Sequence, residues 1–220
     1  MKTEHLLIMR FTALGEVAML VPVVSSLAQQ YPELRITVLS NPFARSLFDG
    51  IAHNVGFMAA DLNGEYHGVK GLNALYRRLV AKNFTAIADM QSILRSSYLR
   101  MRFNISSYRV EHLDNHRQDR RKLVATKDKC LRQLPSLFDD YIDVLARLGY
   151  NVRLDFQSLF PPTGGNLRLV SDRIGEKKMF QQWIGIAPFA AFRGKVYPAQ
   201  LTERVIAELI RRHPSCRIFL

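Results

Sequence analysis

Short apolar runs alternate with amphipathic segments from the start of the chain. The apolar run His5–Phe11 ends in small and polar residues, which is typical of a buried strand followed by a turn. Arg35–Leu39 is rich in β-branched residues and predicts a second strand. Between the two runs, apolar residues recur at helical spacing, at Val17, Leu20, Val21, Val24 and Leu27. A strand, a helix and a strand in this order predict two parallel strands with a crossover.

The same alternation continues to the end of the chain and predicts a doubly wound α/β fold with a Rossmann-like parallel sheet. Further strands are expected at Val55–Met58, Ala86–Met90, Tyr108–Val110, Trp183–Ala187 and Cys216–Leu220. Further helices are expected at Phe43–Phe48, Gly71–Ala81, Ser92–Phe103, Leu137–Leu148, Leu167–Gln182 and Ala199–Arg211. Asp114–Lys129 is densely charged without periodicity and predicts a loop. Gly149 is expected to end the helix Leu137–Leu148.

The clearest linker candidate is the run Pro161–Gly165, which contains two prolines and two glycines. It predicts a first domain over residues 1–170 and the beginning of a second domain over residues 171–220.

Composition narrows the class of protein. The chain has 220 residues, of which 48% are hydrophobic, and no apolar run reaches the roughly 18 to 20 residues that span a bilayer. The amino terminus lacks the apolar core of a signal peptide, so we expect a cytoplasmic protein. The two cysteines, Cys130 and Cys216, have no CxxC partner, and the six histidines show no metal-binding spacing, so neither a metal nor a cofactor is expected.

The net charge of +12 is concentrated between Arg95 and Arg132, which favours an anionic partner. Within this stretch, Arg120, Arg121 and Lys122 could contact phosphate groups or a membrane face, and a solvated charged loop explains them equally well. No aromatic residues are interleaved with these cations, and no nucleic-acid-binding motif is present, so a nucleic-acid partner is not expected.

In doubly wound folds, ligands lie beyond the carboxyl ends of the strands. The first such turn contains Thr12, Gly15 and Glu16, with a single glycine instead of a dinucleotide-binding fingerprint. A carboxylate at this position could act as general base toward a sugar hydroxyl. The alternative is that Glu16 only complements the helix dipole.

Two later turns also follow the carboxyl ends of predicted strands. The turn after the strand at Ala86–Met90 carries Asp89, Gln91 and Arg95, which could bind hydroxyl groups or an anionic sugar. Asp89 could equally be a satisfied residue at the end of a strand. The turn after Trp183–Ala187 carries Arg193 and Lys195, which suit phosphate groups, although a solvated lysine is as good an explanation.

Four segments in this order resemble one family, the lipopolysaccharide heptosyltransferases of glycosyltransferase family 9. Leu6–Ser40 resembles the opening strand, turn and proline-containing helix of the family. Phe84–Phe103 is similar to the family's strand and turn of the type D-L-Q-x-x-x-[KR]-S. Leu137–Tyr150 resembles the helix that ends the acceptor domain, and Trp183–Leu209 is similar to the segment that opens the donor domain.

The resemblance implies the GT-B architecture, in which two Rossmann-like domains face a cleft, with this chain holding the first domain and the first β-α-β of the second. It implies inverting, metal-independent transfer of heptose from ADP-heptose to a lipid-linked, anionic saccharide, at the inner face of the cytoplasmic membrane as a peripheral protein. Glu16 then takes the place of the family's proposed base, and Lys195, with Arg193, contacts the donor phosphates. The acceptor is expected near the other residues of the first two turns and the basic stretch, Thr12, Gly15, Asp89, Gln91, Arg95, Arg120, Arg121 and Lys122.

The chain departs from the family pattern at several positions. Glu16 stands where aspartate is usual, Tyr197 where tryptophan is common, and Pro188 and Phe189 where small hydroxyl residues usually lie. The later nucleotide-sugar motif of the family would follow Leu220, so we expect a chain truncated within the donor domain and nearly inactive. The alternative interpretation is a non-catalytic module that binds anionic glycolipid or a membrane surface.

Overall fold

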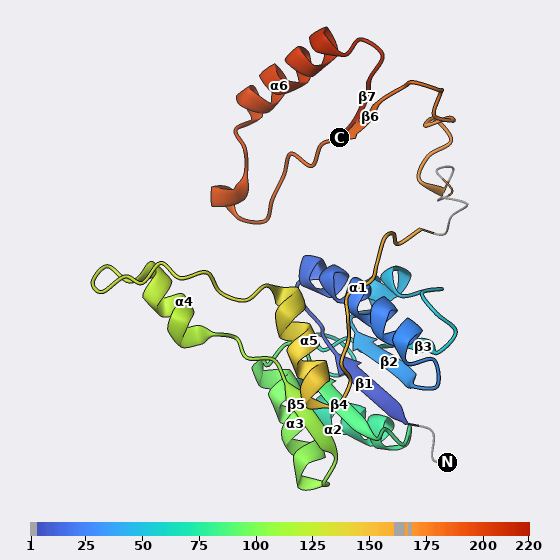
Figure 1. The fold of residues 1–220 in the computed structure, drawn as a ribbon, viewed down its shortest axis with the longest axis vertical. Helices are drawn as coiled ribbons and strands as arrows, with labels where there is room; N and C mark the ends of the chain where they lie inside the picture. The colour runs from blue at the N-terminus through green and yellow to red at the C-terminus, as the bar shows by residue number, and fades with distance from the viewer. Residues whose placement is uncertain (1–3, 161–165, 167–168) are drawn as a thin grey trace. The chain divides into compact units, whose positions relative to one another are not determined.

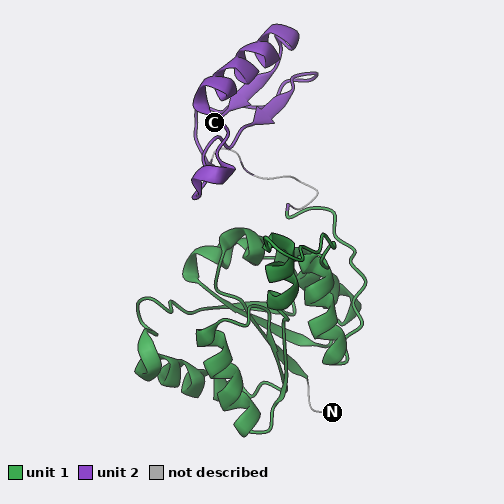
Figure 2. Ribbon diagram, turned by 90° about the vertical axis from the view of Figure 1, so that its left-hand side faces the viewer, with its two compact units in different colours: residues 1–159 green, residues 160–220 purple. Residues whose placement is uncertain are grey.

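The computed structural model describes residues 4–160, residue 166 and residues 169–220. The chain forms two compact units, residues 1–159 and residues 160–220 (Figure 2). The division falls close to the expected linker, whose residues 161–165 lie outside the described residues.

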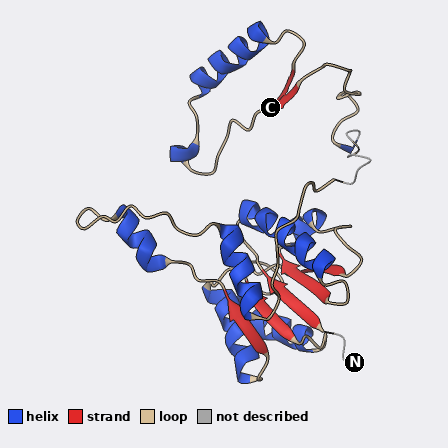
Figure 3. Cartoon of the chain, viewed as in Figure 1, coloured by secondary structure: helices blue, strands red, loops and turns tan. Residues whose placement is uncertain are grey.

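The first unit is built on a five-stranded sheet in which all paired strands are parallel. Its order is β3-β2-β1-β4-β5 (Figures 1 and 3). The strands are β1 (His5–Met9), β2 (Arg35–Ser40), β3 (Val55–Ala59), β4 (Ala86–Asp89) and β5 (Arg109–His112). The predicted doubly wound fold is therefore confirmed for this unit.

Helices cover both faces of this sheet because successive strand residues point to opposite sides. Leu6 and Ile8 of β1 pack with α1 (Leu14–Gln30), the 3₁₀ helix η1 (Pro42–Leu47) and α5 (Leu137–Arg147). Leu7 and Met9 pack on the other face with α2 (Gly68–Val80) and α3 (Leu94–Ile105). The central strand is apolar at all these positions because both of its faces are buried.

The ends of α5 follow from its local sequence. Ser136 caps the helix by accepting a hydrogen bond from the Asp139 N–H, and the Asp139 carboxylate accepts one in return from the Ser136 N–H at 3.0 Å. Gly149 follows the helix with a φ of +93°, a conformation that favours glycine. The prediction that Gly149 ends this helix is confirmed.

The second unit contains two parallel strands, β6 (Trp183–Gly185) and β7 (Arg217–Phe219), joined through η3 (Arg193–Lys195) and α6 (Ala199–Arg212). This is the β-α-β arrangement that the alternation predicts for the segment. Among the described residues of the whole chain, no helix is long and apolar enough to cross a membrane.

Two sequence predictions differ from the structure. Within the predicted loop Asp114–Lys129, residues Arg117–Val124 form α4, which has no buried residue. Such a helix needs no apolar stripe, so hydrophobic periodicity could not reveal it. The predicted helix Leu167–Gln182 is wrong for residues 171–182, which form turns and irregular backbone. Its exposed apolar side chains, Met179 and Phe180 among them, have no face to pack against within the described part of the unit.

Leu20, fully buried on α1 between the sheet and α5, is expected to be a major contributor to the stability of the first unit. Leu20→Ala is expected to lower the free energy of unfolding by about 2–5 kcal/mol, because it removes buried methyl groups and leaves a cavity. The matched control is Leu94→Ala, at a side chain that is 88% exposed, with an expected change within about 0.5 kcal/mol. Urea unfolding followed by far-ultraviolet circular dichroism measures both, and equal losses would contradict the assignment of the core.

Candidate active site

The candidate site lies at the point where the chain reverses its direction across the sheet. From β1 the chain first builds outward through β2 and β3, and it then returns to place β4 and β5 on the other side of β1. Met9 of β1 and Asp89 of β4 are paired at the carboxyl ends of their strands. Crevices at such a switch point are where doubly wound folds bind ligands.

Glu16 stands in the first turn of α1, at the carboxyl end of β1. One carboxylate oxygen, Oε2, accepts hydrogen bonds from the guanidinium of Arg10 and from the Ala13 N–H at 3.2 Å. Within the described residues, the other oxygen, Oε1, has no protein partner, and the Glu16 side chain is 51% exposed. The carboxylate is thus anchored on one side and open to solvent on the other.

Arg10 lies between the turns that follow β1 and β4. It is almost fully buried, and it donates to the Met90 carbonyl as well as to Glu16. Its guanidinium lies 5.5 Å from the ring centroid of Tyr141, whose hydroxyl donates to the Glu16 carbonyl at 2.9 Å. Burial raises the pKa of Tyr141, so this phenol stays neutral and remains a donor. A buried guanidinium needs a charged partner, and Glu16 supplies it.

Gln91 joins the first turn to the second. Its Oε1 accepts from the buried Phe11 N–H at 2.9 Å, and its Nε2 donates to the Thr12 carbonyl at 3.1 Å and to the Thr12 hydroxyl. The amide of Gln91 is therefore engaged on both of its ends by the protein itself. This geometry holds the β1 turn against the β4 turn.

Asp89 organises the second turn in the same way. Its Oδ1 accepts from the N–H groups of Gln91 at 3.1 Å and Ser92 at 3.0 Å. Its Oδ2 lies 3.5 Å from Arg100, and the Asp89 side chain is fully buried. The structure therefore gives Asp89 and Gln91 positioning partners, and their contact with an acceptor stays a prediction.

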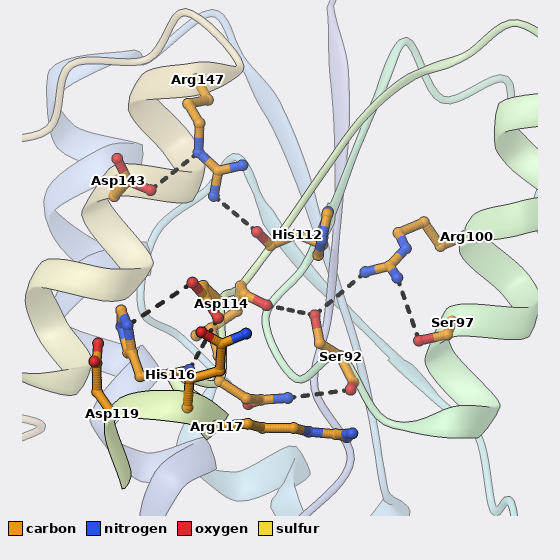
Figure 4. A pocket seen from close by; sticks show the side chains of 13 residues that line it. Ser92, Ser97, Arg100, His112, Asp114, His116, Arg117, Asp119, Asp143 and Arg147 are labelled. Atoms are coloured by element: carbon orange, nitrogen blue, oxygen red, sulfur yellow. Dashed lines mark hydrogen bonds and ion pairs between the residues drawn. The ribbon is translucent and has the colours of Figure 1, made fainter. Parts of the chain in front are cut away.

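A pocket of about 950 Å³ opens beside these turns, between α3, α5 and the segment that follows β5 (Figure 4). Its lining combines cations, carboxylates, histidines and small polar groups. Ser92 and Arg100 connect it to the turn of Asp89, since Arg100 donates to the Ser92 hydroxyl at 3.2 Å. On the opposite wall, Arg147 donates to Asp143 at 3.0 Å and to the His112 carbonyl at 2.7 Å. Such a mixed polar lining suits hydroxyl-rich or anionic ligands.

The pKa values of the two histidines in the pocket are shifted in opposite directions. Burial, followed by the charge of Arg100, lowers the pKa of His112 below 6.5. The hydrogen bond to Asp140, at 2.8 Å, raises the pKa of His116 above 6.5. At neutral pH the imidazole of His112 is therefore uncharged, while His116 is charged to a larger extent than an unperturbed histidine.

The other predicted acceptor residues lie at different places on the first unit. Arg95 donates to the Leu62 carbonyl at 3.1 Å and to Asn63 at 2.7 Å, so it connects α3 to the turn after β3. Gly15 is exposed, and a side chain there would meet no atom within 4 Å. The basic residues Arg120, Arg121 and Lys122 are exposed on α4, whose first turn lines the pocket instead, through Arg117, Gln118 and Asp119.

The predicted donor residues lie in the second unit. Arg193 and Lys195 begin and end η3, just before α6, and both are exposed. The Lys195 ammonium is 5.6 Å from the ring centroid of Phe192. Their contact with a donor phosphate stays a prediction.

Sequence reasoning missed the residues that follow β5. His112 lies at the carboxyl end of that strand, and Asn115 and His116 lie just beyond it, at the same edge of the sheet as Glu16. The rule that ligands lie beyond the carboxyl ends of the strands applies to these residues too. The predicted strand is short, however, and the dense charge after it indicates a loop and not a ligand site. No local sequence pattern singles out Arg100 or Arg147 as a pocket residue, because each reaches the pocket from within a helix.

Among the described residues, no group of three or more histidine, cysteine, aspartate or glutamate side chains could hold a metal ion. The polar groups of the site are instead joined to one another and to backbone groups.

No family model matches the chain, and no curated protein matches it at a significant level. Solved structures do match. A glycosyl transferase of family 9 from Veillonella parvula is 18% identical, with a TM-score of 0.70, and the match covers 100% of this chain and 63% of that one. Escherichia coli heptosyltransferase WaaC with ADP is 15% identical, with a TM-score of 0.63, and the match covers 97% of this chain and 65% of that one. WaaC with ADP-2-deoxy-2-fluoro heptose is 14% identical at the same TM-score, with 97% and 67% covered.

The chain has a parallel α/β fold that matches the domains of GT-B glycosyltransferases. More narrowly, the chain has the fold of the family 9 glycosyltransferases, the group that includes the heptosyltransferase structures, and the predicted resemblance is confirmed at this level. The chain spans about two thirds of the length of these structures, between 63% and 67%.

Gln91→Ala is expected to lower the free energy of unfolding by about 1–3 kcal/mol, because the buried Phe11 N–H loses its acceptor. Gln118→Ala, at an exposed glutamine on α4, is the matched control and should change it by less than about 0.5 kcal/mol. The measurement is urea unfolding of the two variants beside the unchanged protein. A loss for Gln91→Ala no larger than that of the control would show that the two turns are held together by other contacts.

His116 is expected to stabilise the protein more at pH 5.5 than at pH 8.5. The pKa of His116 is higher in the folded protein than in the unfolded chain, so its contribution is complete below pH 6.5 and is lost as the pH rises through the folded value. Asp140 and Asp114 favour the charged ring, and Arg120 opposes it. The loss of unfolding free energy in His116→Asn should thus shrink between pH 5.5 and pH 8.5.

The matched control for His116→Asn is His53→Asn, at an exposed histidine outside the pocket. Its effect should vary less between the two pH values. A loss in His116→Asn that is constant, or that grows with pH, would contradict the charged pair with Asp140.

Proposed function

We propose that the protein is an inverting glycosyltransferase of lipopolysaccharide core biosynthesis that transfers heptose from ADP-heptose to a lipid-linked, acidic saccharide. One observation carries the proposal. In a fold shared with heptosyltransferase structures, Glu16 holds a carboxylate at the switch point with one oxygen anchored and the other open. A base must be fixed in position and must also be accessible to the hydroxyl that it deprotonates.

In the proposed step, an acceptor hydroxyl oxygen attacks the anomeric carbon of the donor heptose. The bond between that carbon and the β-phosphate oxygen breaks, and its electron pair leaves with ADP. The hydroxyl proton passes to Oε1 of Glu16, and attack from the face opposite to ADP inverts the anomeric centre. Arg10 and the Ala13 N–H keep the carboxylate in place through Oε2.

The donor is proposed to bind the second unit through Arg193 and Lys195. Their two positive charges are adjacent to the start of α6, where backbone N–H groups are also available to phosphate oxygens. The WaaC structures of the same fold contain ADP and an ADP-heptose analogue, which supports a nucleotide-sugar donor. Two cations and helix-start amides supply the positive charge, so the proposal requires no metal.

The acceptor is proposed to occupy the 950 Å³ pocket and the surface next to Glu16. Thr12 and Gly15 form the exposed rim of the first turn, and Arg95 lies on α3 near the turn after β3. On α4, Arg120, Arg121 and Lys122 are proposed to contact acidic groups of the acceptor or the membrane surface, because all three are exposed and uncovered by other side chains. Such contacts would place the protein at the inner face of the cytoplasmic membrane.

One observation supports the alternative function of a non-catalytic module that binds anionic glycolipid or a membrane surface. α4 has four cations and a single carboxylate among eight residues, and none of these residues is buried. A helix of this kind contributes little to a core and is well placed for an anionic surface.

Glu16→Gln is expected to lower the rate of heptose transfer about 100-fold or more, because the amide cannot accept the hydroxyl proton. Gln has nearly the same shape as Glu and can still accept from Ala13. Transfer should be measured under single-turnover conditions with protein in excess, so that slow transfer is detected, using ADP-heptose and an anionic lipid-linked saccharide. Glu33→Gln makes the same change at an exposed residue and is a control outside the proposed machinery.

Equal rates for the unchanged protein and Glu16→Gln would remove Glu16 as the base. Salt-sensitive binding of the acceptor without any transfer would support the alternative module. Rapid multiple turnover by the 220-residue chain would contradict the expectation that it is nearly inactive.

A further inference from the structure

A second pocket, of about 310 Å³, lies away from the candidate active site, at the β3 side of the sheet. Its floor contains His5, Arg35 and Gly56 on the three neighbouring strands β1, β2 and β3. His5 and Arg35 are the first residues of their strands, so the pocket reaches the amino ends, opposite to Glu16. A wall comes from Arg78 and Lys82 at the end of α2.

All the charged residues in the lining of this pocket are cations. The lining includes Arg35, Arg45, Arg78 and Lys82, and none of its residues is acidic. Within the described part of the chain, none of these four cations forms an ion pair with a carboxylate. Four like charges around one cavity repel one another, and an anion bound among them would relieve that repulsion.

The cations are held by uncharged neighbours that leave their charge available. Arg45 lies 5.2 Å from the ring centroid of Phe57, and Arg78 donates to the Tyr66 hydroxyl at 2.5 Å. These contacts orient both guanidinium groups without neutralising them. All four cations are also exposed, so their charges are accessible to a ligand from solvent.

The floor residue His5 is buried and uncharged. It is 5% exposed, and its two ring nitrogens contact the Lys82 carbonyl at 3.2 Å and the Thr37 hydroxyl at 2.8 Å. Burial and the charge of Arg35 lower the pKa of His5, so the ring is neutral at pH 7. His5 therefore connects the end of α2 to the floor as a neutral group.

Gly56 lines the pocket and has no side chain to occupy it. A Cβ built on Gly56 would meet only the Ile36 carbonyl oxygen, at 3.8 Å, which is an ordinary contact. A larger side chain at this position would therefore extend into the pocket without a clash against the backbone. The volume is at the lower end of the range for ligand sites and suits a single small group.

We propose that this pocket binds a phosphate ester: a small ligand with a phosphate or diphosphate group, either free or as the headgroup of a lipid. Arginine and lysine side chains are the usual partners of phosphate oxygens, and no carboxylate in the lining would repel them. The site is separate from the transfer reaction and does not depend on it.

Isothermal titration of the full 220-residue protein with inorganic pyrophosphate, at constant ionic strength, tests the site. Saturable binding is expected for the unchanged protein. Gly56→Leu should abolish one binding event by filling the pocket, and the pair Arg35→Gln with Lys82→Gln should weaken that event about tenfold or more. Lys177→Gln with Lys178→Gln removes the same charge from exposed positions in the second unit and should leave it unchanged.

Two further titrations distinguish the sources of the phosphate. Binding to vesicles of phosphatidic acid in phosphatidylcholine that is lost in Gly56→Leu would identify a lipid headgroup. Saturable binding of glucose 6-phosphate that is lost in the same variant, without vesicle binding, would identify a free ester. Circular dichroism confirms folding of each variant, and the charge pair remains a test if Gly56→Leu does not fold. Pyrophosphate affinity unchanged in the charge pair, or no saturable binding by the unchanged protein, would overturn the proposal.

Discussion

The buried guanidinium of Arg10 is the constraint on which the first unit depends. Its cost of desolvation is offset by the carboxylate of Glu16 and the carbonyl of Met90, which belong to two different turns. Removing the Glu16 carboxylate would leave the buried charge of Arg10 without an anionic partner. The carboxylate proposed to do the chemistry is therefore also a structural anion, and stability and activity have to be measured separately at this position.

The polar side chains at the switch point have two roles. Some join the turns after β1 and β4, and one carboxylate remains accessible to solvent. Gln91 and Asp89 satisfy buried backbone N–H groups, and their side chains have protein partners on both ends. Glu16 keeps one oxygen free of protein partners among the described residues. A carboxylate held in this way needs little reorganisation when a ligand binds.

The two ends of the sheet differ in charge. At the carboxyl ends, carboxylates and histidines accompany the cations of the large pocket, as with Asp143 beside Arg147. The small pocket reaches the amino ends, and its titratable residues are four cations and a neutral histidine, without a carboxylate. The net charge of +12 is therefore not confined to the middle stretch of the sequence, and part of it surrounds a cavity assembled from three strands and a helix.

Apart from α4, the sequence by itself determined the order of strands and helices in the first unit, because burial on both faces of a parallel sheet demands short apolar runs such as β1. It also placed Glu16, Asp89 and Gln91 at one edge, since the carboxyl ends of parallel strands coincide. Only the tertiary structure showed that the side chains of Gln91 and Asp89 accept hydrogen bonds from backbone N–H groups. It also showed that His112 lines the large pocket and that a second pocket lies at Gly56. Those features depend on contacts between residues far apart in the chain, and the local pattern of hydrophobic and polar residues does not predict such contacts.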